Sequence, residues 1–363
     1  MKNTFPICDL HCDTILKLMG GAGLDDTSLQ VNLPYLEEAG VGLQVFACYI
    51  PTTIPPGRRF PLVNRMIDCF EQKVALHADR ITICRTDTDV EEARSQGKIA
   101  AVLAVENGSA IESDLKNLEA LYGRGVRLMT LIHSQSNDWV ISSNDRSPKF
   151  DGLTAFGVEV IAAMNDLGMI IDVSHSHDTT VRRVLELSRK PVIASHSCVH
   201  NLCPVPRNLK DDLIKGLAAN GGLVGVNLFP GFLDPVYQQL AEKHAGDLFS
   251  ELNKAEEAAG EDMGKLAKIL DEFAERFTPI MRIHRVPVEQ YLRHLNHIVG
   301  LAGEDYAAFG SDFDGVPDLP GEVKDCRIFS LIKATLLEST LAPPQVEKIC
   351  WSNFRRVFRA VCG

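Results

Sequence analysis

The sequence has no uninterrupted apolar run of 18 residues or more, so it predicts no membrane-spanning helix. It also lacks an excess of positive charge: 37 lysines and arginines stand against 48 aspartates and glutamates, which gives a net charge of −11. This acidic balance argues against nucleic acid or an anionic membrane as a partner. No Gly-x-Gly-x-x-Gly turn or P-loop follows the first strand-like segment, which argues against a doubly wound nucleotide-binding sheet.

The ten cysteines include no Cys-x-x-Cys pair. In a large chain of this kind we expect reduced core residues rather than disulfides. Cys12 and Cys198 lie close to the candidate metal ligands described below, but a hydrolytic site does not need thiolate ligands. Strand-like sequence begins by Pro6, which leaves no room for the apolar region and cleavage site of a signal peptide. We therefore expect a cytoplasmic protein.

Eight short apolar runs alternate with segments that are mostly helical in period or rich in glycine and proline. This alternation predicts parallel βαβ units, and eight of them predict a closed (β/α)8 barrel, a TIM-like α/β fold, in one domain over residues 1–363. The runs are Ile7–Asp13, Val41–Tyr49, Ile99–Glu106, Val126–His133, Met169–His175, Val192–His196, Leu223–Asn227 and Ala307–Asp312.

Six of the eight runs end in, or carry near their end, a histidine or a carboxylate. The carboxyl ends of parallel barrel strands meet at one mouth, so these side chains are expected to lie together. His177 and Asp314 compete with His175 and Asp312, but both lie further beyond their apolar runs. The residues at the predicted mouth are His11, Asp13, Glu106, His133, His175, His196 and Asp312.

Histidine and carboxylate ligands without thiolate suit Zn²⁺ in a hydrolytic role. Five of the residues are too many for one tetrahedral ion and suit two ions about 3.5–4 Å apart, with a bridging hydroxide as the nucleophile. Glu106 would bridge the ions because a carboxylate has two oxygens. His11 and Asp13 would hold one ion, and His175 and His196 the other.

Residues 234–281 interrupt the barrel rhythm between the seventh and eighth predicted strands. The segment holds 11 acidic and 5 basic residues, and apolar residues recur in it at helical spacing. We expect an inserted pair of acidic helices. A lid or a dimer contact and a simple decoration of the barrel rim are equally compatible with this pattern.

The motifs DLHCDT, AVENG, LMTLIHS, IIDVSH, IASHS, VPRN, GSDFDGV and NFRRVF follow one another along nearly the whole chain. In this order they resemble the renal-dipeptidase-like family of zinc metallopeptidases, also called membrane dipeptidases, in the amidohydrolase superfamily. The resemblance implies a homodimeric, binuclear zinc enzyme that cleaves dipeptides, often with a D-residue at the carboxyl-terminal position. It implies that His133 steadies the carbonyl oxygen, Arg207 binds the substrate carboxylate, Asp312 shuttles the proton and Tyr49 faces the substrate.

Two other functions are compatible with the same scaffold. A metal-dependent hydrolase of a lactone or a cyclic amide is the first, but such substrates need no carboxylate clamp of the kind that Arg207 offers. A metal-binding relative without activity is the second, but none of the expected ligands is missing. Many superfamily members bridge their metals with a carboxylated lysine, and the absence of lysine from Val126–His133 agrees with Glu106 as the bridge.

Overall fold

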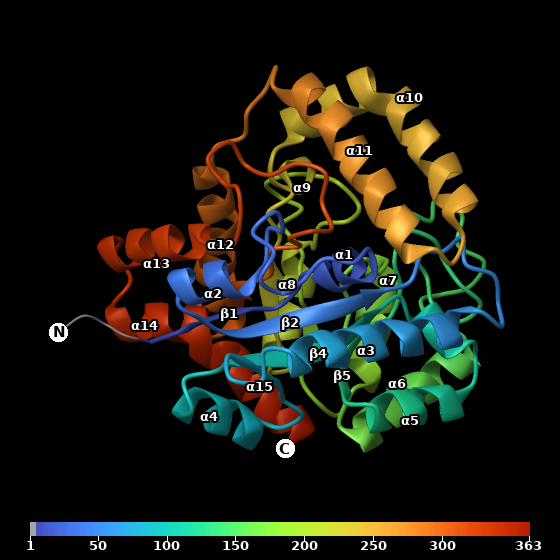
Figure 1. Ribbon diagram of the computed structural model, residues 1–363, viewed down its shortest axis with the longest axis horizontal. Coiled ribbons are helices and arrows are strands. Elements are labelled where there is room, and N and C mark those ends of the chain that lie inside the picture. Colours follow the sequence, from blue (N-terminus) through green and yellow to red (C-terminus); the bar gives the residue numbers. More distant parts are fainter. Residues whose placement is uncertain (1–4) are drawn as a thin grey trace.

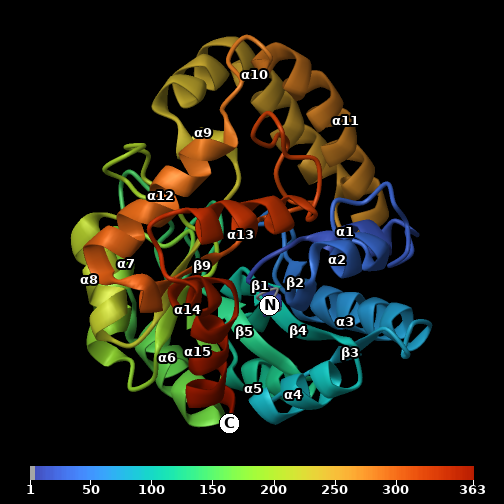
Figure 2. The same cartoon turned by 90° about the vertical axis from the view of Figure 1, so that its left-hand side faces the viewer.

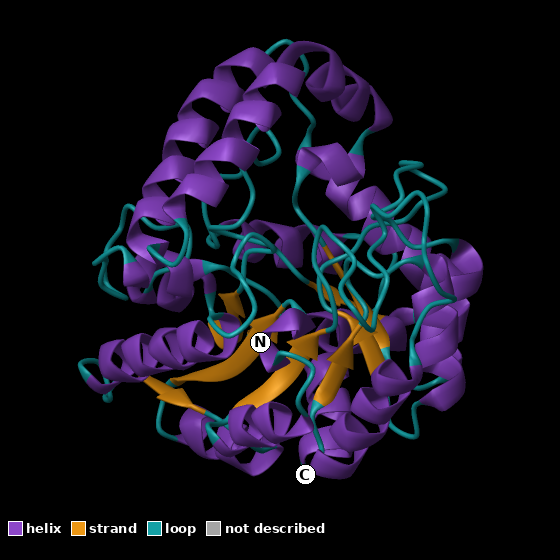
Figure 3. Cartoon of the chain, turned by 90° about the vertical axis from the view of Figure 1, so that its right-hand side faces the viewer, coloured by secondary structure: helices purple, strands orange, loops and turns teal. Residues whose placement is uncertain are grey.

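The computed structural model describes residues 5–363, and a barrel of parallel strands forms its centre (Figures 1 and 3). The described strands are β1 (Ile7–Asp9), β2 (Val41–Tyr49), β3 (Ile81–Ile83), β4 (Ile99–Glu106), β5 (Val126–Thr130), β6 (Ile170–Asp172), β7 (Val192–Ala194), β8 (Leu223–Val226) and β9 (Ala307–Phe309). Because β9 pairs with β1 and β2 pairs with β4, all of these strands except β3 form a closed ring. The predicted eight-stranded barrel is confirmed.

β3 is a strand that the sequence did not predict. It pairs only with the beginning of β4, where Ile81 lies opposite Ile99, and β5 pairs with the same strand from Leu103 onward. The other three-residue strands, β1, β6, β7 and β9, were predicted from longer runs that end in a histidine or a carboxylate, and Ile81–Ile83 belongs to no such run. β3 therefore extends the sheet locally and contributes nothing to the closed ring.

Most barrel strands end two to four residues earlier than predicted, and the polar residues lie in the turns that follow. The reason is visible after β7 and β9, where the backbone N–H groups of Ser195 and Ser311 bond to the carboxylates of Asp172 and Asp9. These side-chain bonds replace the ladder bonds of the sheet. The prediction that His11 and Asp13 belong to the first strand is wrong, although the two side chains still lie 3.5 Å apart.

Helices surround the barrel, as the views in Figures 1 and 2 show. The α-helices are α1 (Thr14–Met19), α2 (Leu33–Ala39), α3 (Arg59–Ala75), α4 (Asp87–Ser95), α5 (Leu115–Gly123), α6 (Ala155–Leu167), α7 (Asp178–Leu187), α8 (Asp211–Ala219), α9 (Pro230–Leu233), α10 (Pro235–Ala259), α11 (Met263–Met281), α12 (Val288–Ala302), α13 (Ile328–Glu338), α14 (Pro343–Glu347) and α15 (Asn353–Cys362). Shorter turns are the 3₁₀ helices η1 (Gly108–Ile111) and η2 (Glu304–Tyr306) and the π-helical η3 (Lys348–Ser352). Among the helices of residues 5–363, none is long and apolar enough to cross a bilayer.

The barrel has an apolar interior that α15 closes at one end. Leu43 and Val45 of β2 point inward and belong to the same buried cluster as Phe354 and Phe358 of α15. The side chain of Asn353 binds the carbonyl of Ala307, the first residue of β9, so α15 covers the amino-terminal end of the strands. The opposite mouth is left for the polar residues.

The predicted helical insertion between the seventh and eighth barrel strands is confirmed as α10 and α11. Both helices stand together beyond one end of the barrel (Figure 2). They pack on each other through aromatic rings, since Phe249 lies 5.1 Å from Phe273 and 5.4 Å from Phe277 between ring centroids. Their apolar residues thus face one another, and the acidic residues lie mostly outside.

Candidate metal centre and active site

Glu106 lies at the centre of the polar residues that gather at the mouth of the barrel. Its Oε2 atom is 3.5 Å from Nε2 of His11, and its Oε1 atom is 3.1 Å from Nε2 of His175 and 3.4 Å from Nε2 of His196. Oδ2 of Asp13 lies 3.5 Å from the same nitrogen of His11. The structure therefore brings the five predicted ligands together, and the two oxygens of Glu106 face different histidines.

Several buried polar atoms of this cluster lack hydrogen-bond partners. Within residues 5–363, these are both ring nitrogens of His11, Oδ1 of Asp13 and Nδ1 of His133. Buried polar groups of this kind are costly unless something completes their coordination. Sets of ligand atoms within 4.8 Å of one another are His11–Asp13–Glu106, Glu106–His133–His175 and His11–His196–Asp312. The residues present fit divalent metal ions, and the sets also contain His133 and Asp312, for which other roles were predicted.

Four residues of the cluster have pKa shifts that favour their metal-binding forms, whereas burial raises the pKa of Asp13 to about 7. Burial raises the pKa of Glu106, but the charge of His11 and hydrogen bonds from the histidines lower it by more, so the pKa lies well below its ordinary value. Burial lowers the pKa of His133, His175 and His196. In His11 burial lowers the pKa, but the neighbouring carboxylates raise it well above the ordinary value. Ionised carboxylate and neutral imidazole are the ligating forms, so ion binding at His11 would release a proton.

Asp172 and Ser195 orient the ring of His196. The carboxylate of Asp172 lies 2.6 Å from the hydroxyl oxygen of Ser195, and this oxygen lies 2.7 Å from Nδ1 of His196. Because the hydroxyl donates to the carboxylate, its oxygen accepts the Nδ1–H of His196, and Nε2 stays free to face Glu106. Asp172 also accepts hydrogen bonds from the hydroxyl of Thr130 and from the backbone N–H groups of Ser174 and Ser195.

Ser195→Ala is expected to weaken metal binding by about 10- to 100-fold, the usual cost of removing the partner that orients a ligating histidine. Competition with a chelating dye measures the affinity directly. Thr130→Val is the matched control, because Thr130 donates to the same oxygen of Asp172 at 2.6 Å without touching His196. Unchanged affinity in Ser195→Ala, or an equal loss in both variants, would contradict a role for Ser195 in orienting the ring.

Asp9 and Ser311 form a similar hydrogen-bonded pair elsewhere at the barrel mouth. Asp9 accepts a backbone hydrogen bond from Ser311 at 2.8 Å, and the Ser311 hydroxyl lies 2.6 Å from its other oxygen. The amide of Gln44 also donates to this carboxylate at 2.8 Å. Burial raises the pKa of Asp9 to about 6 despite these bonds. Asp9 therefore fastens strands together, and it belongs to none of the clustered ligand sets.

Asp312 presents one oxygen to the cluster. The side-chain amide of Asn227 donates to its Oδ2 at 2.7 Å, and its Oδ1 lies 3.7 Å from Nε2 of His11. Asp312 and His175 have left-handed backbones, with φ of 67° and 65°, a conformation that costs free energy outside glycine and is concentrated at functional sites. A Cβ atom at Gly315 would lie 2.0 Å from Oδ2 of Asp13 and 3.0 Å from Oδ1 of Asp312, so glycine keeps this space open.

Asn227 is a site residue that the sequence reasoning missed. It follows β8 directly and closes the seventh predicted apolar run, as the other polar residues of the mouth close theirs. The same positional signal would have identified it. It was overlooked because an amide is neither a common ligand nor a general base.

The structure separates the competing residues. Nδ1 of His177 accepts a hydrogen bond from the backbone of Thr179 at the start of α7, whereas His175 contacts Glu106. Asp314 accepts from the hydroxyl of Thr14 at 2.7 Å and from the backbone of Gln30 at 2.9 Å, so it fastens a loop.

The two cysteines near the cluster do not join it. Their thiols lie 3.4 Å from backbone carbonyls, Cys12 from that of Val45 and Cys198 from that of Asn227. Burial raises the pKa of both thiols, which keeps them protonated.

Two cavities adjoin the cluster, with volumes of about 570 and 530 Å³. Tyr49 lines the first cavity, Arg207 lines the second, and His133 lines both. The ring of His133 packs against Tyr49 at 4.8 Å between centroids. The three residues predicted to contact substrate therefore line two cavities that share His133 and His175.

Arg207 is buried beside the cluster, with 7% of its surface exposed. Its Nη2 donates to the carbonyl of His196 and its Nη1 to the hydroxyl of Ser197, both at 2.7 Å. Within residues 5–363 its Nε–H has no partner. The guanidinium is thus held in place and keeps one unused donor, and the residue lines the second cavity.

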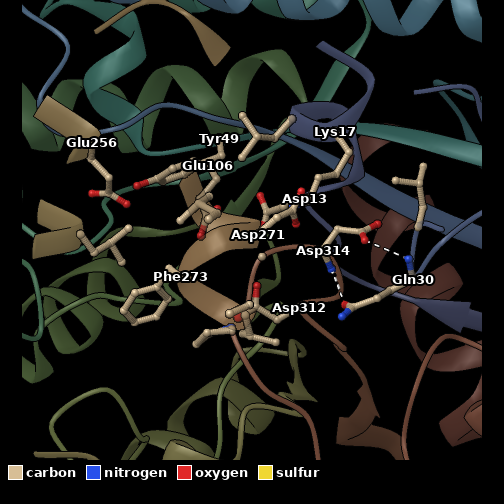
Figure 4. Close-up of a pocket in the computed structure, with 18 of the residues that line it drawn as sticks. Asp13, Lys17, Gln30, Tyr49, Glu106, Glu256, Asp271, Phe273, Asp312 and Asp314 are labelled. Atoms are coloured by element: carbon tan, nitrogen blue, oxygen red, sulfur yellow. Dashed lines mark hydrogen bonds and ion pairs between the residues drawn. The ribbon is translucent and has the colours of Figure 1, made fainter. Parts of the chain in front are cut away.

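The insertion covers the first cavity. Lys17 of α1 forms an ion pair with Asp271 of α11, and Glu261 between the two helices pairs with Arg58 and Arg65 at 3.3 and 2.8 Å. Figure 4 shows Glu256 and Phe273 among the residues that line this cavity. The lining residues from the insertion are Phe249, Leu252, Glu256, Leu270, Asp271, Phe273, Ala274 and Glu275. This placement favours a lid over simple decoration of the barrel rim as the role of the insertion.

Comparisons with known proteins agree with this architecture. The model of the membrane dipeptidase family, peptidase family M19, matches residues 1–362. Dipeptidase 3 of Mus musculus is 27% identical over 99% of this chain, which spans 65% of that protein's length. The solved structure of an M19 metallopeptidase, dipeptidase AC, has a TM-score of 0.80 at 24% identity and covers 99% of both chains. A metallopeptidase from Rhodobacter sphaeroides, solved with a phosphinate mimic of L-Ala-D-Ala, has a TM-score of 0.79 at 23% identity and covers 98% of this chain and 99% of its own.

Proposed function

Because the chain belongs to the membrane dipeptidase family, peptidase family M19, we propose that it is a metal-dependent dipeptidase that works with two zinc ions. The observation that carries the proposal is the position of Glu106. One of its oxygens faces His11 beside Asp13, and the other faces His175 and His196. This division supports two ions with a shared carboxylate. Two bound ions would acidify a water molecule and polarise the scissile carbonyl.

The other residues of the site supply binding and proton transfer. Asp312 takes the proton from the attacking water and passes it to the leaving amine, because one of its oxygens faces the cluster while Asn227 holds the other. His133, kept neutral by burial, donates a hydrogen bond to the carbonyl oxygen as negative charge develops there. Arg207 binds the substrate carboxylate with its planar guanidinium.

The proposal extends to substrates with a D-residue at the carboxyl-terminal position. The support is the solved relative from Rhodobacter sphaeroides, which holds a mimic of L-Ala-D-Ala. The homodimer, the cytoplasmic location and Tyr49 as a substrate-facing residue stay predictions.

The experiment that tests the function combines metal analysis with a substrate panel. Purified protein should contain two zinc ions per chain and hydrolyse L-Xaa-L-Xaa and L-Xaa-D-Xaa dipeptides. Dipeptides with an amidated carboxyl terminus should be poor substrates, because Arg207 then loses its partner. Hydrolysis of a lactone or a cyclic amide in preference to every dipeptide would contradict the proposal.

Glu106→Gln tests the shared carboxylate. The amide keeps the size of the side chain but loses its charge and one acceptor oxygen, so at least one ion should bind more weakly. After dialysis against a chelator, metal analysis should show fewer than two ions per chain, while the wild type retains both. Two ions held with unchanged affinity would remove Glu106 from the metal centre.

A further inference from the structure

The two cavities give a bound dipeptide a direction, if the proposed function is correct. Arg207 lines only the second cavity, so the carboxyl-terminal residue of the substrate lies there. His133 and His175 line both cavities, which places the peptide bond above them. The amino-terminal residue then extends into the first cavity, beneath α10 and α11.

The first cavity combines apolar walls with two carboxylates that have no partner within residues 5–363, the half-buried Glu256 and the exposed Glu275. Lys17, a cationic residue of its lining, is already paired with Asp271. Within residues 5–363, Glu256 of α10 forms no hydrogen bond or ion pair, and burial raises its pKa. Figure 4 shows Glu256 on the side of Tyr49, away from Lys17. The apolar walls are Leu16, Leu29, Leu252, Leu270 and Phe273.

Asp13 and Glu106, two of the predicted metal ligands, line the floor of the same cavity. The α-ammonium group of a dipeptide is one bond from the α-carbon, so it stays near this floor and the scissile carbonyl. The apolar walls and Glu256 are therefore free to contact the side chain of the substrate's amino-terminal residue.

We propose that the first cavity is a subsite for an amino-terminal residue with a long cationic side chain, such as lysine or arginine, and that Glu256 is the specificity-determining residue. The aliphatic stem would pack against the leucines and Phe273, and the charged end would pair with the carboxylate. A half-buried carboxylate without a partner gains most from a cation and repels an acidic side chain. Because Glu256 lies in the insertion, α10 would add this preference to the barrel's own chemistry.

Glu256→Gln tests the proposal with L-Lys-L-Ala, L-Arg-L-Ala, L-norleucyl-L-Ala and L-Ala-L-Ala. Norleucine has the length of lysine without the charge, and all four substrates carry the same α-ammonium group. Wild-type kcat/KM should be highest for the cationic pair. The variant should lose about tenfold on that pair, which corresponds to ~1.4 kcal/mol, and keep its rate on the other two. Glu257→Gln, which changes an exposed neighbour outside the cavity lining, should match the wild type on all four.

Two results would overturn the subsite. Equal losses on all four substrates would place Glu256 at the α-ammonium group, and no loss on any would remove it from recognition. Calorimetric binding of the lysyl and norleucyl dipeptides to the Asp312→Asn protein gives the same comparison without turnover. If no dipeptide is hydrolysed by zinc-loaded wild type, the proposed function fails, and the binding comparison still decides the subsite.

Discussion

Asp312→Asn should lower kcat by about 10²–10⁴-fold, the usual contribution of general acid–base assistance, while both metal ions are retained. The amide keeps the shape of the side chain but cannot accept a proton. The oxygen of the new amide can still accept the hydrogen bond that Asn227 donates to Oδ2 of Asp312, so the predicted metal ligands should stay in place. KM should change little, because Arg207 and the metal centre carry substrate binding.

Metal stoichiometry of the Asp312→Asn protein separates a proton shuttle from a ligand. The distinction matters because Asp312 also belongs to a set of ligand atoms with His11 and His196. His11, Asp13, His175 and His196 with a shared Glu106 already give each ion three protein contacts, and a further ligand would occupy the position that water or substrate needs. If the variant retains two ions but has a strongly reduced kcat, Asp312 is a proton shuttle. Loss of an ion would refute that role.

Arg207→Met should raise KM for dipeptides by about 10- to 100-fold, on the scale of the 1.5–3 kcal/mol of a charged hydrogen bond. Methionine preserves much of the packing against Phe232 but removes every donor. Amidating the substrate carboxylate should cost the wild type far more than it costs the variant, because only the wild type loses an ionic contact. Steady-state kinetics on free and amidated dipeptides measures both effects.

The Arg207 experiment needs a control for structural damage, because the guanidinium also binds the carbonyl of His196 and the hydroxyl of Ser197. Arg207→Lys keeps the charge and should recover part of the KM loss. Metal content should be full in both variants. Equal penalties from amidation in wild type and Arg207→Met would show that Arg207 does not recognise the carboxylate.

The barrel and its polar mouth could be predicted because both depend on local sequence. Apolar runs between helical segments predicted the parallel strands, and the position of histidines and carboxylates at the ends of those runs predicted the gathering around Glu106. The insertion was predictable as two helices for the same reason, since its apolar residues recur at helical spacing. β3 was not predicted, because its three residues belong to no longer run that ends in a histidine or a carboxylate.

The positions at which the strands end, and the role of each residue at the barrel mouth, could not be predicted without the tertiary structure. The sequence could not show that Asp172 and Asp9 take over the ladder bonds beyond β7 and β9, because each partner serine is distant along the chain. It could not choose between His175 and His177 by contact, and it could not show that Asn227 holds one oxygen of Asp312.

The sequence by itself determined the fold class, the set of candidate metal ligands and the acidic helical insertion, because periodicity and residue type are local properties. Only the tertiary structure decided which oxygen of Glu106 faces which histidine, that Ser195 orients His196, and that α10 brings Glu256 over the site. These are contacts between segments far apart in the chain. They depend on how the strands close into a ring and where the insertion folds back, and no single stretch of sequence contains that information.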